Sequence, residues 1–468
     1  MVHEPSTTSS GVAVPGSPPT AGGRGVRQVR PDDAARGGAV PGRAAGSVPA
    51  VAEHPAGPDR SDAPPTTARD GVSRDGTAPD GTAPARRRVA VVFGGRSSEH
   101  GISCVTAAGV LRALDRERWD VVPVGIALDG RWVLAADDPA RWELSGGVLP
   151  VVDAGEGPAV LAPRSPVERG LVALDAGDVP RALGEVDVVL PLLHGSFGED
   201  GTLQGLLEMS DTRYVGSGVL SSAVAMDKHY AKTVLAAAGI PVGAWALVTD
   251  RAWLADREER LDAVLAVAEG AGASVVFVKP CRAGSSMGVT RVVLGDEPGA
   301  LREGAREALA AAVGAAREHD PRVLVEAAVV GRELECGVLD APGGAAPEAS
   351  VVGEVAVTDG RDFYDFEAKY LDDAAVRLTC PAEVDDDVAE AVRATALAAF
   401  EALGCEGLAR VDVFATPDGR VVVNEVNTMP GFTPSSMFPR LWEASGLTYP
   451  ALVDRLLELA LERRTGLR

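Results

Sequence analysis

The chain has 468 residues, of which 46% are hydrophobic and 24% are charged. This length allows two or three globular domains of about 100–200 residues each. The formal net charge of −22 argues against nucleic acid or an anionic membrane as a partner, because binding to either needs a basic face. It does not exclude small anionic substrates, which a local cluster of Lys and Arg can bind.

The five cysteines are dispersed along the chain, and no two of them form a CxxC pair. This pattern predicts free thiols in a reducing compartment rather than disulfides or a metal site. The sequence has no secretory leader pattern and no apolar run of about 18 residues. We therefore expect a cytoplasmic protein.

Residues 1–85 are rich in Pro, Gly, Ala, Ser, Thr and Asp and almost lack aromatic and long aliphatic side chains. Such a segment cannot bury enough apolar surface to offset the entropy lost on ordering. It is predicted to be a disordered tail.

From Arg88 the pattern becomes that of an open α/β domain, expected over residues 86–228. Residues 88–93 (RVAVVF) form a continuous apolar run, which is typical of a strand buried on both faces. A helical pattern at 104–114 and a second strand at 119–128 predict a parallel sheet with a crossover helix. The other elements expected here are a hairpin-bearing insertion at 132–183, a strand at 186–195 and a helix at 202–209.

Two further domains are expected, a central one at 229–332 and a C-terminal one at 333–468. The central domain begins with a helix that Gly239 and Pro241 end. Its other elements are strands at 274–280 and 322–329 and a helix at 300–319. The C-terminal elements are strands at 332–340 and 350–357, helices at 385–404 and 449–464, and a hairpin between these helices.

The strands of this last hairpin can be paired from the sequence. The Asp-Gly pair at 418–419 lies between two apolar runs and predicts a two-residue turn. Asp412 then lies opposite Glu425, and Arg410 lies opposite Asn427, with all four side chains on one face. The valines expected on the other face are Val411, Val413 and Val426.

Two opposed carboxylates repel unless a cation lies between them. With the amide oxygen of Asn427, Asp412 and Glu425 form an oxygen-only set of the kind that Mg²⁺ prefers. The alternative is the solvated face of an edge hairpin, where mixed charges are common. The following NTMPGF loop favours a metal site, because Pro430 and Gly431 bend the chain so that backbone amides can face a ligand anion.

A candidate phosphate loop follows Lys279, which ends a buried strand. Residues 284–288 are small, so the backbone can approach a phosphate closely. The lysine precedes the glycines, unlike in a Walker A loop, and an ordinary turn is the alternative. An ammonium buried there needs an anionic partner. Upstream, Lys232 follows Lys228 by one helical turn, where a solvated pair is the commoner interpretation.

Glu326 and Glu333 bracket the connector between the central and C-terminal domains. A domain junction is a favoured place for a small-molecule site. Carboxylates there suit the hydrogen-bond donors of adenine or ribose better than they suit phosphates.

The stretch VAVVFGGRSSEHG at 89–101 has the strand and paired glycine of a nucleotide-phosphate loop. It lacks the G-x-G-x-x-G spacing of a nicotinamide or flavin oxidoreductase, and Glu99 would repel a phosphate. An oxidoreductase and a non-catalytic binding module remain alternatives at this point. The latter is disfavoured because the polar set of the hairpin is intact.

From about Arg87 to the C-terminus, the chain resembles a D-alanine–D-alanine ligase of the ATP-grasp superfamily. The HGSFGEDGTLQG and NEVNTMPGFT motifs are highly specific. The other matching motifs are VAVVFGGRSSEHGIS, YVGSGVLSSAVAMDKHYAK, VKPCRAGSSMGV, YDFEAKY and ARVDVF, and all occur in family order.

The resemblance implies the ATP-grasp fold, an α/β architecture in which an open α/β domain precedes two α+β domains that clasp ATP. It implies ATP-dependent ligation of two D-alanines through a D-alanyl phosphate, for peptidoglycan synthesis. The cofactors would be ATP and two Mg²⁺ ions, with Mn²⁺ as a substitute, and the assembly a homodimer. The alternatives are a ligase with D-lactate or D-serine as second substrate, or another carboxylate–amine ligase.

The resemblance also implies roles for individual residues. The first D-alanine would bind Glu99 with His194 close by, and the second would bind Ser436. The residues expected to bind ATP are Lys232, Lys279, Ser285, Ser286, Gly288, Glu326, Glu333 and Lys369. The metal ligands would be Asp412, Glu425 and Asn427.

Arg410 and the backbone amide of Gly431 would stabilise the acyl phosphate and the tetrahedral intermediate. Ser285 and Tyr370 would link to Glu99 by hydrogen bonds and fasten a lid. A tyrosine after Lys369 accompanies D-alanine as second substrate in the family, which favours the dipeptide product. The chain departs from the family at Gly101, where many members have an acidic residue.

Overall fold

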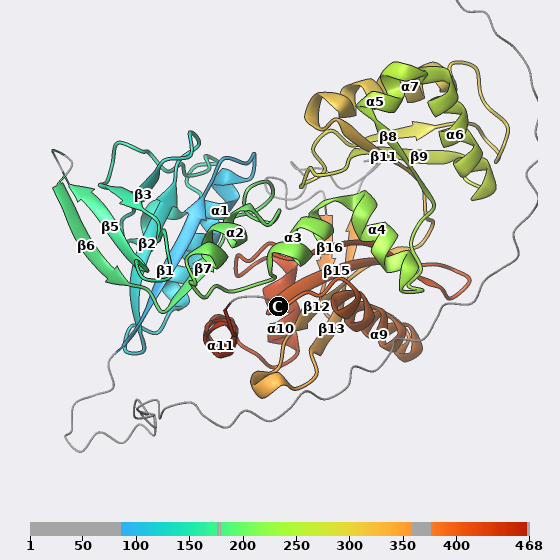
Figure 1. Cartoon of the computed structure of the whole chain (residues 1–468). Coiled ribbons are helices and arrows are strands. Elements are labelled where there is room, and N and C mark those ends of the chain that lie inside the picture. The colour runs from blue at the N-terminus through green and yellow to red at the C-terminus, as the bar shows by residue number, and fades with distance from the viewer. Residues whose placement is uncertain (1–85, 176, 178, 358–375, 466–468) are drawn as a thin grey trace, which may run out of the picture. The chain divides into compact units, whose positions relative to one another are not determined.

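The computed structural model describes residues 86–465, with the exception of 176, 178 and 358–375 (Figure 1). The tail predicted at 1–85 lies outside the described residues, as do Lys369 and Tyr370. The described part contains three β-sheets, which lie within residues 87–191, 245–327 and 332–427.

The first sheet has a parallel centre and an antiparallel edge, in the strand order β6-β5-β4-β3-β2-β1-β7. β1 (Arg87–Gly94) pairs in parallel with both β2 (Trp119–Ile126) and β7 (Val188–Pro191). α1 (His100–Ala113) connects β1 to β2, which confirms the predicted β-α-β unit. The predicted insertion forms the antiparallel strands β3 (Trp132–Leu134), β4 (Ala159–Leu161), β5 (Gly170–Asp175) and β6 (Val179–Glu185), with the 3₁₀ helix η1 (Pro139–Trp142) between the first two.

The second sheet is antiparallel, in the order β10-β9-β11-β8. Its strands are β8 (Trp245–Thr249), β9 (Val275–Pro280), β10 (Thr290–Val293) and β11 (Arg322–Ala327). Three helices pack on it through a core of Val, Leu and Ala (Figure 1). They are α5 (Asp250–Ala255), α6 (Arg257–Gly270) and α7 (Ala305–His319), the last of which was expected to begin at residue 300.

The third sheet is also antiparallel, in the order β14-β13-β12-β15-β16. Leu334, Cys336 and Val411 point into the core against α9. Because side chains alternate along a strand, Glu335 and Arg410 project from the opposite face. The elements are β12 (Arg332–Leu339), η2 (Pro342–Gly344), β13 (Glu348–Val357), β14 (Val376–Thr379), α9 (Asp386–Ala402), β15 (Leu408–Ala415), β16 (Val421–Asn427) and α10 (Met437–Ala444).

The β15–β16 hairpin has the predicted pairs but not the predicted turn. Asp412 pairs with Glu425 and Arg410 with Asn427, as expected. The two-residue turn was wrong: residues 417–419 form the loop, Ala415 pairs with Val421, and Gly419 has a φ of 83°. A three-residue loop that ends in a left-handed glycine is a common hairpin connection.

Two departures from regular pairing cancel in this hairpin. Near the turn, Val413 pairs with Val423, one residue out of the register expected for a two-residue turn. Asn424 is the extra residue of a β-bulge, and it restores the expected register at Asp412. The bulge therefore places Glu425 opposite Asp412.

Three helices outside the sheets pack against elements that are distant from them in the sequence. α3 (Val219–Met226) and α4 (Lys228–Ala237) pack against β16, and Ala225 and Leu235 belong to the core of the third sheet. α11 (Tyr449–Glu462) packs against α1. The predicted domain boundary at residue 228 thus lies between two helices that share one core. The domain boundaries stay a prediction.

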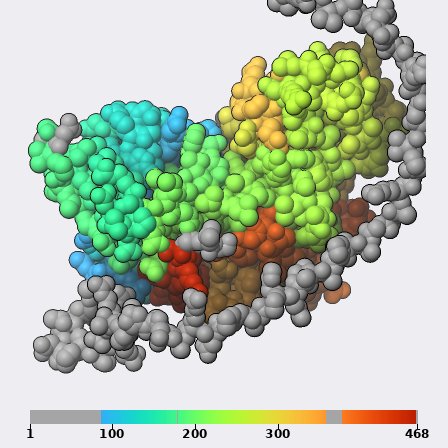
Figure 2. All heavy atoms as spheres, in the orientation of Figure 1, coloured from blue at the N-terminus to red at the C-terminus, as the bar shows by residue number. Residues whose placement is uncertain are grey.

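Two apolar side chains are exposed on the helices that follow the first sheet. Met209 ends α2 (Thr202–Met209) and is 76% exposed, and Leu220 on α3 is 75% exposed. The green atoms of this region lie in the middle of the face drawn in Figure 2. None of the helices in the described ranges is both long and apolar enough to cross a membrane.

Candidate active site

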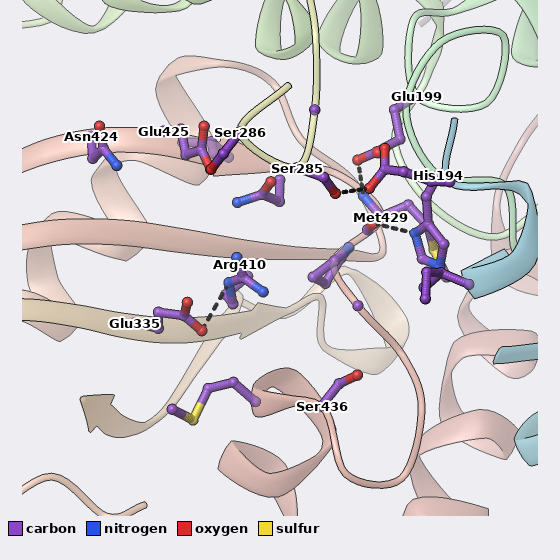
Figure 3. Close-up of a pocket in the computed structure, with 18 of the residues that line it drawn as sticks. His194, Glu199, Ser285, Ser286, Glu335, Arg410, Asn424, Glu425, Met429 and Ser436 are labelled. Carbon is purple, nitrogen blue, oxygen red and sulfur yellow. Dashed lines mark hydrogen bonds and ion pairs between the residues drawn. The ribbon is translucent and has the colours of Figure 1, made fainter. Parts of the chain in front are cut away.

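A cavity of about 940 Å³ is lined by strands of the second and third sheets and by loops that follow strands of the first sheet. Glu99 and His194 come from loops at the ends of β1 and β7, and Lys279 from the end of β9. Arg410 and Glu425 come from the polar face of the third sheet. Side chains from distant parts of the sequence therefore converge on one space (Figure 3).

Lys279 has the anionic partner that a lysine at the end of a buried strand needs. Its Nζ donates to Glu326 Oε2 at 2.9 Å, and Lys232 forms an ion pair with the other oxygen, Oε1. Burial alone would raise the pKa of Glu326, but the two lysines lower it to about 2. Glu326 lines the cavity, with both oxygens engaged by lysines.

Lys232 and Lys228 are not the solvated pair that their spacing favoured, and they differ in their access to the cavity. Lys232 is 2% exposed and is not among the residues that line the cavity. Lys228, one turn earlier in α4, does line it, and its Nζ donates to Ala283 O at 3.0 Å. The same ammonium lies 3.7 Å from Glu425 Oε2. Lys228 is thus the lysine of this pair with access to a ligand in the cavity.

The Gly/Ser loop between β9 and β10 contacts the loop that follows β1. Ser285 Oγ donates to Glu99 Oε1, which is the contact that the resemblance implies. Gly284 lies so close that a Cβ atom there would be 2.7 Å from Glu99 Oε2. Ser285 and Ser286 line the cavity, and both have a positive φ, of 48° and 58°. Gly288 is not among the lining residues.

The oxygen-rich hairpin faces the cavity through Glu425 and Asn427, while Asp412 is only 4% exposed behind them. Asn427 Nδ2 donates to Asp412 Oδ2 at 3.0 Å. Within the described ranges, no group of three or more His, Cys, Asp or Glu side chains forms a ready metal site. Two carboxylates and an amide oxygen nevertheless fit Mg²⁺, which commonly combines one or two carboxylates with substrate phosphates.

Arg410 lies between two carboxylates on the third sheet. Its Nε is 2.7 Å from Asp412 Oδ1 and 3.1 Å from Glu335 Oε2, and its Nη2 donates to Asp412 Oδ2 at 2.8 Å. Burial alone would lower the pKa of Arg410, but Asp412 and Glu335 raise it well above its usual value. The guanidinium is therefore a permanent positive charge at the cavity wall.

His194 is a neutral hydrogen-bonding residue in this site. Burial lowers its pKa, against the opposing effect of Glu99. Nδ1 donates to Met429 O at 3.2 Å, and Nε2 lies 3.2 Å from Thr106 Oγ1, so it accepts from that hydroxyl. His194 thereby ties the loop after β7 to the loop after β16 (Figure 3).

Glu199 makes a second tie between the same two loops. Its Oε2 accepts from Gly195 N at 2.7 Å and its Oε1 from Met429 N at 3.0 Å. Met429 is thus held at its amide by Glu199 and at its carbonyl by His194. This fixes the start of the loop that carries Gly431.

The loop after β16 also places Ser436 at the cavity. Ser436 precedes α10, and its Oγ accepts from Thr433 N at 3.2 Å. Gly431 lies beside it, because a Cβ on that glycine would be 3.2 Å from Ser436 Oγ. Both residues line the cavity. The structure therefore brings together Ser436, which is expected to bind the second D-alanine, and Gly431, whose amide is expected to stabilise the tetrahedral intermediate.

Gly101 contacts a residue of the insertion in the first sheet. A Cβ at this position would lie 2.6 Å from Leu149 Cβ, and Leu149 lines the cavity. An acidic side chain, which the resemblance leads us to expect here, would displace this leucine. The glycine at position 101 therefore leaves room for Leu149, which forms an apolar part of the cavity wall.

Lys228, Glu199, Glu335 and Asn424 are among the cavity residues that had no role in the sequence analysis. Glu199 is part of the HGSFGEDG motif, and that motif was the one available signal for it. Glu335 alternates with Glu333 on β12 and so shares its face. Asn424 was missed because the bulge was not predicted.

The raised pKa of Glu199 predicts a pH dependence of stability. Burial and then the nearby Glu99 raise this pKa from 4.5 to about 8. Between these values the folded protein holds a proton that the unfolded chain has lost, so this group makes stability fall as pH rises. The contribution is up to about 1.4 kcal/mol per pH unit. Glu199→Gln should flatten the decline in melting temperature from pH 5 to pH 8, and identical slopes for both proteins would contradict this assignment.

Two family models match the chain. The model described as D-ala D-ala ligase N-terminus matches residues 88–217, and the D-ala D-ala ligase C-terminus model matches residues 234–458. The D-alanine–D-alanine ligase of Kineococcus radiotolerans is 60% identical, with 81% of this chain and 98% of that protein covered. The corresponding ligase of Streptomyces coelicolor is 51% identical, with coverages of 81% and 95%.

Solved structures give the same result. The VanG D-Ala:D-Ser ligase from Enterococcus faecalis has a TM-score of 0.66 and 31% identity, over 80% of this chain and 100% of that chain. The D-alanine-D-alanine ligase from Coxiella burnetii has a TM-score of 0.64 and 34% identity, over 81% and 96%. The fold is therefore that of the ATP-grasp ligases. More narrowly, the chain belongs to the D-alanine–D-alanine ligase family.

Proposed function

We propose that the protein joins two molecules of D-alanine, with cleavage of ATP to ADP and phosphate, to make D-alanyl-D-alanine for peptidoglycan precursors. The observation that carries this proposal is a single cavity that holds a lysine pair, the polar hairpin and Glu99. These groups match the three parts of such a reaction, which are a nucleotide triphosphate, its metal ions and an amino acid.

ATP would bind on the side of the second sheet. Lys279 and Lys228 line the cavity and would donate hydrogen bonds to the phosphates. Lys232 would act indirectly, because its positive charge compensates the negative charge of Glu326. Ser285 and Ser286 lie in the loop that would cover the phosphates. Glu333 would accept from the ribose hydroxyls at the far end of the cavity.

The metal ions would bind at Asp412, Glu425 and Asn427, and two Mg²⁺ ions fit the proposed reaction. When bound, they would neutralise charge on the ATP phosphates. The residues themselves supply only oxygen ligands, and Mn²⁺, which accepts the same ligands, is proposed as a substitute.

The first D-alanine would place its ammonium at Glu99 and its carboxylate toward Arg410. A carboxylate oxygen attacks the γ-phosphorus of ATP, the bond to the bridging oxygen breaks, and ADP leaves. This converts a poor electrophile into an acyl phosphate. Arg410 lowers the energy of charge that develops on the transferring phosphoryl group, because it is buried, charged and already in place.

The second D-alanine would be held by its carboxylate at Ser436. Its amine, deprotonated before it enters the site, attacks the acyl carbon. The bond from that carbon to the phosphate oxygen breaks, and the leaving phosphate takes the proton that the nitrogen gives up. The Gly431 amide and Arg410 face the oxyanion that forms in this step. Closure of the Gly/Ser loop onto Glu99 excludes water, which would otherwise hydrolyse the acyl phosphate.

Phosphate release tests the proposed function directly. We expect ATP cleavage in the presence of Mg²⁺ and D-alanine and little with L-alanine or with no amino acid, because Glu99, Arg410 and the enclosing cavity wall would fix three directions about the α-carbon of the first amino acid. The measurement is coupled phosphate release, with chromatography of the product. Equal release in all three mixtures would rule out the ligase assignment.

The second substrate needs its own comparison. The neighbour from Enterococcus faecalis is named for D-Ala:D-Ser ligation, while the relatives at 51% and 60% identity are named for D-alanine alone. We propose D-alanine, and the test offers D-alanine, D-serine and D-lactate at equal concentration near neutral pH. A predominant ester or D-serine product would overturn this choice.

The three-domain division, a homodimeric assembly and a cytoplasmic location are part of this proposal. ATP and free D-amino acids as substrates support the location. Sedimentation of the purified protein would test the assembly.

A further inference from the structure

A row of acidic residues crosses the third sheet beside Arg410. Glu335 on β12 pairs in register with Asp412 on β15, which in turn pairs with Glu425 on β16. Paired residues on neighbouring antiparallel strands project from the same face, with their Cβ atoms about 5 Å apart. Glu335 and Asp412 are each only 4% exposed. Two carboxylates so buried and so close need a cation between them.

Arg410 is that cation: its Nε–H donates to Asp412, and the same nitrogen lies within ion-pair distance of Glu335. Nε is 2.7 Å from Asp412 Oδ1 and 3.1 Å from Glu335 Oε2. Figure 3 draws the contact between Glu335 and Arg410. Nη2 lies 2.8 Å from Asp412 Oδ2, which also accepts from Asn427 Nδ2. Asp412 thus accepts two hydrogen bonds from the guanidinium, and Glu335 is the second carboxylate within reach.

A divalent cation at Asp412 would compete with Arg410 for the same two oxygens. Once a cation takes one of them, Arg410 loses part of its partner, and a buried guanidinium needs another acceptor. Glu335 can accept the Nε–H bond from its present distance, so Arg410 need not leave the cavity wall. Without Glu335, Arg410 would depend on Asp412 and resist the cation.

We infer that Glu335 is a positioning residue that holds Arg410 at the cavity while Asp412 binds a divalent cation. This inference rests on the proposed function only for the place of the cation. It assigns Glu335 no contact with substrate. Its effect passes through the Arg410 guanidinium, and it depends on an acceptor oxygen rather than on negative charge alone.

Two substitutions separate these effects. Glu335→Gln keeps an oxygen that can accept from Nε and removes the charge, whereas Glu335→Ala removes both. The matched control is Glu354→Ala on the neighbouring strand β13. Glu354 pairs with Arg332 at 2.7 Å, and neither residue lines the cavity.

The measurement is Mn²⁺ binding to each protein in the presence of ADP, followed by electron paramagnetic resonance, so that no turnover is needed. We expect Glu335→Ala to weaken Mn²⁺ binding about tenfold and Glu335→Gln by about threefold or less, because a neutral acceptor retains part of a hydrogen bond to a charged donor. Glu354→Ala should bind as the unchanged protein does.

Equal losses in the two Glu335 variants would mean that charge alone matters and would overturn the inference. Unchanged binding in Glu335→Ala would do the same. If Glu335→Ala fails to fold, Glu335→Gln decides by itself, since a tenfold loss there contradicts the anchoring role. Failure of D-alanine-dependent phosphate release in the unchanged protein would count against the proposed function and would leave the binding series interpretable.

Discussion

Replacement of Arg410 by Met should lower kcat for D-alanine-dependent ATP hydrolysis by about 10²- to 10³-fold, the usual cost of removing a preorganised donor from a charge-stabilising site. The guanidinium is buried between Asp412 and Glu335 and would stabilise charge in both chemical steps. Its loss removes an interaction that strengthens in the transition state, so kcat should fall far more than the KM for ATP changes. Steady-state kinetics with saturating Mg²⁺ would measure this.

Two further variants separate chemistry from folding. Arg410→Met also leaves two buried carboxylates facing each other, so its melting temperature should fall as well. Arg410→Lys keeps the positive charge but loses the planar fork that spans both carboxylates, and we expect an intermediate loss of kcat. Arg332→Met removes an arginine from a more exposed ion pair outside the cavity and should leave kcat unchanged. A kcat for Arg410→Met within a fewfold of normal would refute the proposed role.

Glu99→Gln should raise the KM for the first D-alanine by about ten- to a hundredfold, as expected for loss of a hydrogen bond between charged groups. Glu99 is 7% exposed and lines the cavity beside His194. An ammonium in this enclosed position is stabilised by a carboxylate and hardly by an amide. The KM for ATP should change much less, because Lys279 and Lys228 are unaffected.

Glu99 also takes part in the contact that fastens the lid, and Glu99→Gln separates this contact from ammonium binding. Ser285 Oγ donates to Glu99, and an amide oxygen at residue 99 can still accept that bond. The lid contact should therefore survive in Glu99→Gln. Glu208→Gln on α2, where the carboxylate accepts from Tyr214 Oη at 2.7 Å, is a matched control outside the cavity. Equal increases in the KM for D-alanine and for ATP would count against the ammonium-binding role.

These two predictions concern different parts of one cavity wall. Glu99 contacts the Gly/Ser loop through Ser285, and Arg410 anchors the polar hairpin through Asp412. Met429 lines the same cavity and is held by Glu199 and His194. A substitution at Glu199 should therefore loosen the loop that carries Gly431, while its direct effect on stability depends on pH as described above.

Local regularities made much of the fold predictable. The apolar run of β1 predicted a strand buried on both faces, since parallel central strands are covered on both sides, and it pairs with β2 and β7. The turn signal at 418–419 led to the correct pairing of Asp412 with Glu425. That success depended partly on the bulge at Asn424, which offset the longer loop, and nothing in the sequence pattern indicated it.

Helical spacing could not separate Lys228 from Lys232, and the family resemblance assigned ATP binding to Lys232. Both lie on one face of α4, and helical spacing makes them equivalent. The structure separates them because Glu326 on β11 comes within reach of Lys232 and draws it into the interior, while Lys228 reaches Ala283 and the cavity. A partner 94 positions away along the chain decides the outcome, and it is visible only once the second sheet is formed.

By itself, then, the sequence determined the α/β class, most of the strands outside the insertion, the polar pairs of the hairpin and the family, because these depend on periodicity and on short motifs. It did not predict β8, β10 and β14. Tertiary structure decided which carboxylates hold which cations. Glu335 has ordinary surroundings in the sequence, and Glu199 lies in a specific motif that by itself does not indicate its contacts. They become site residues because strand register places one beside Arg410, and because two loops more than 200 residues apart meet at Met429 to place the other.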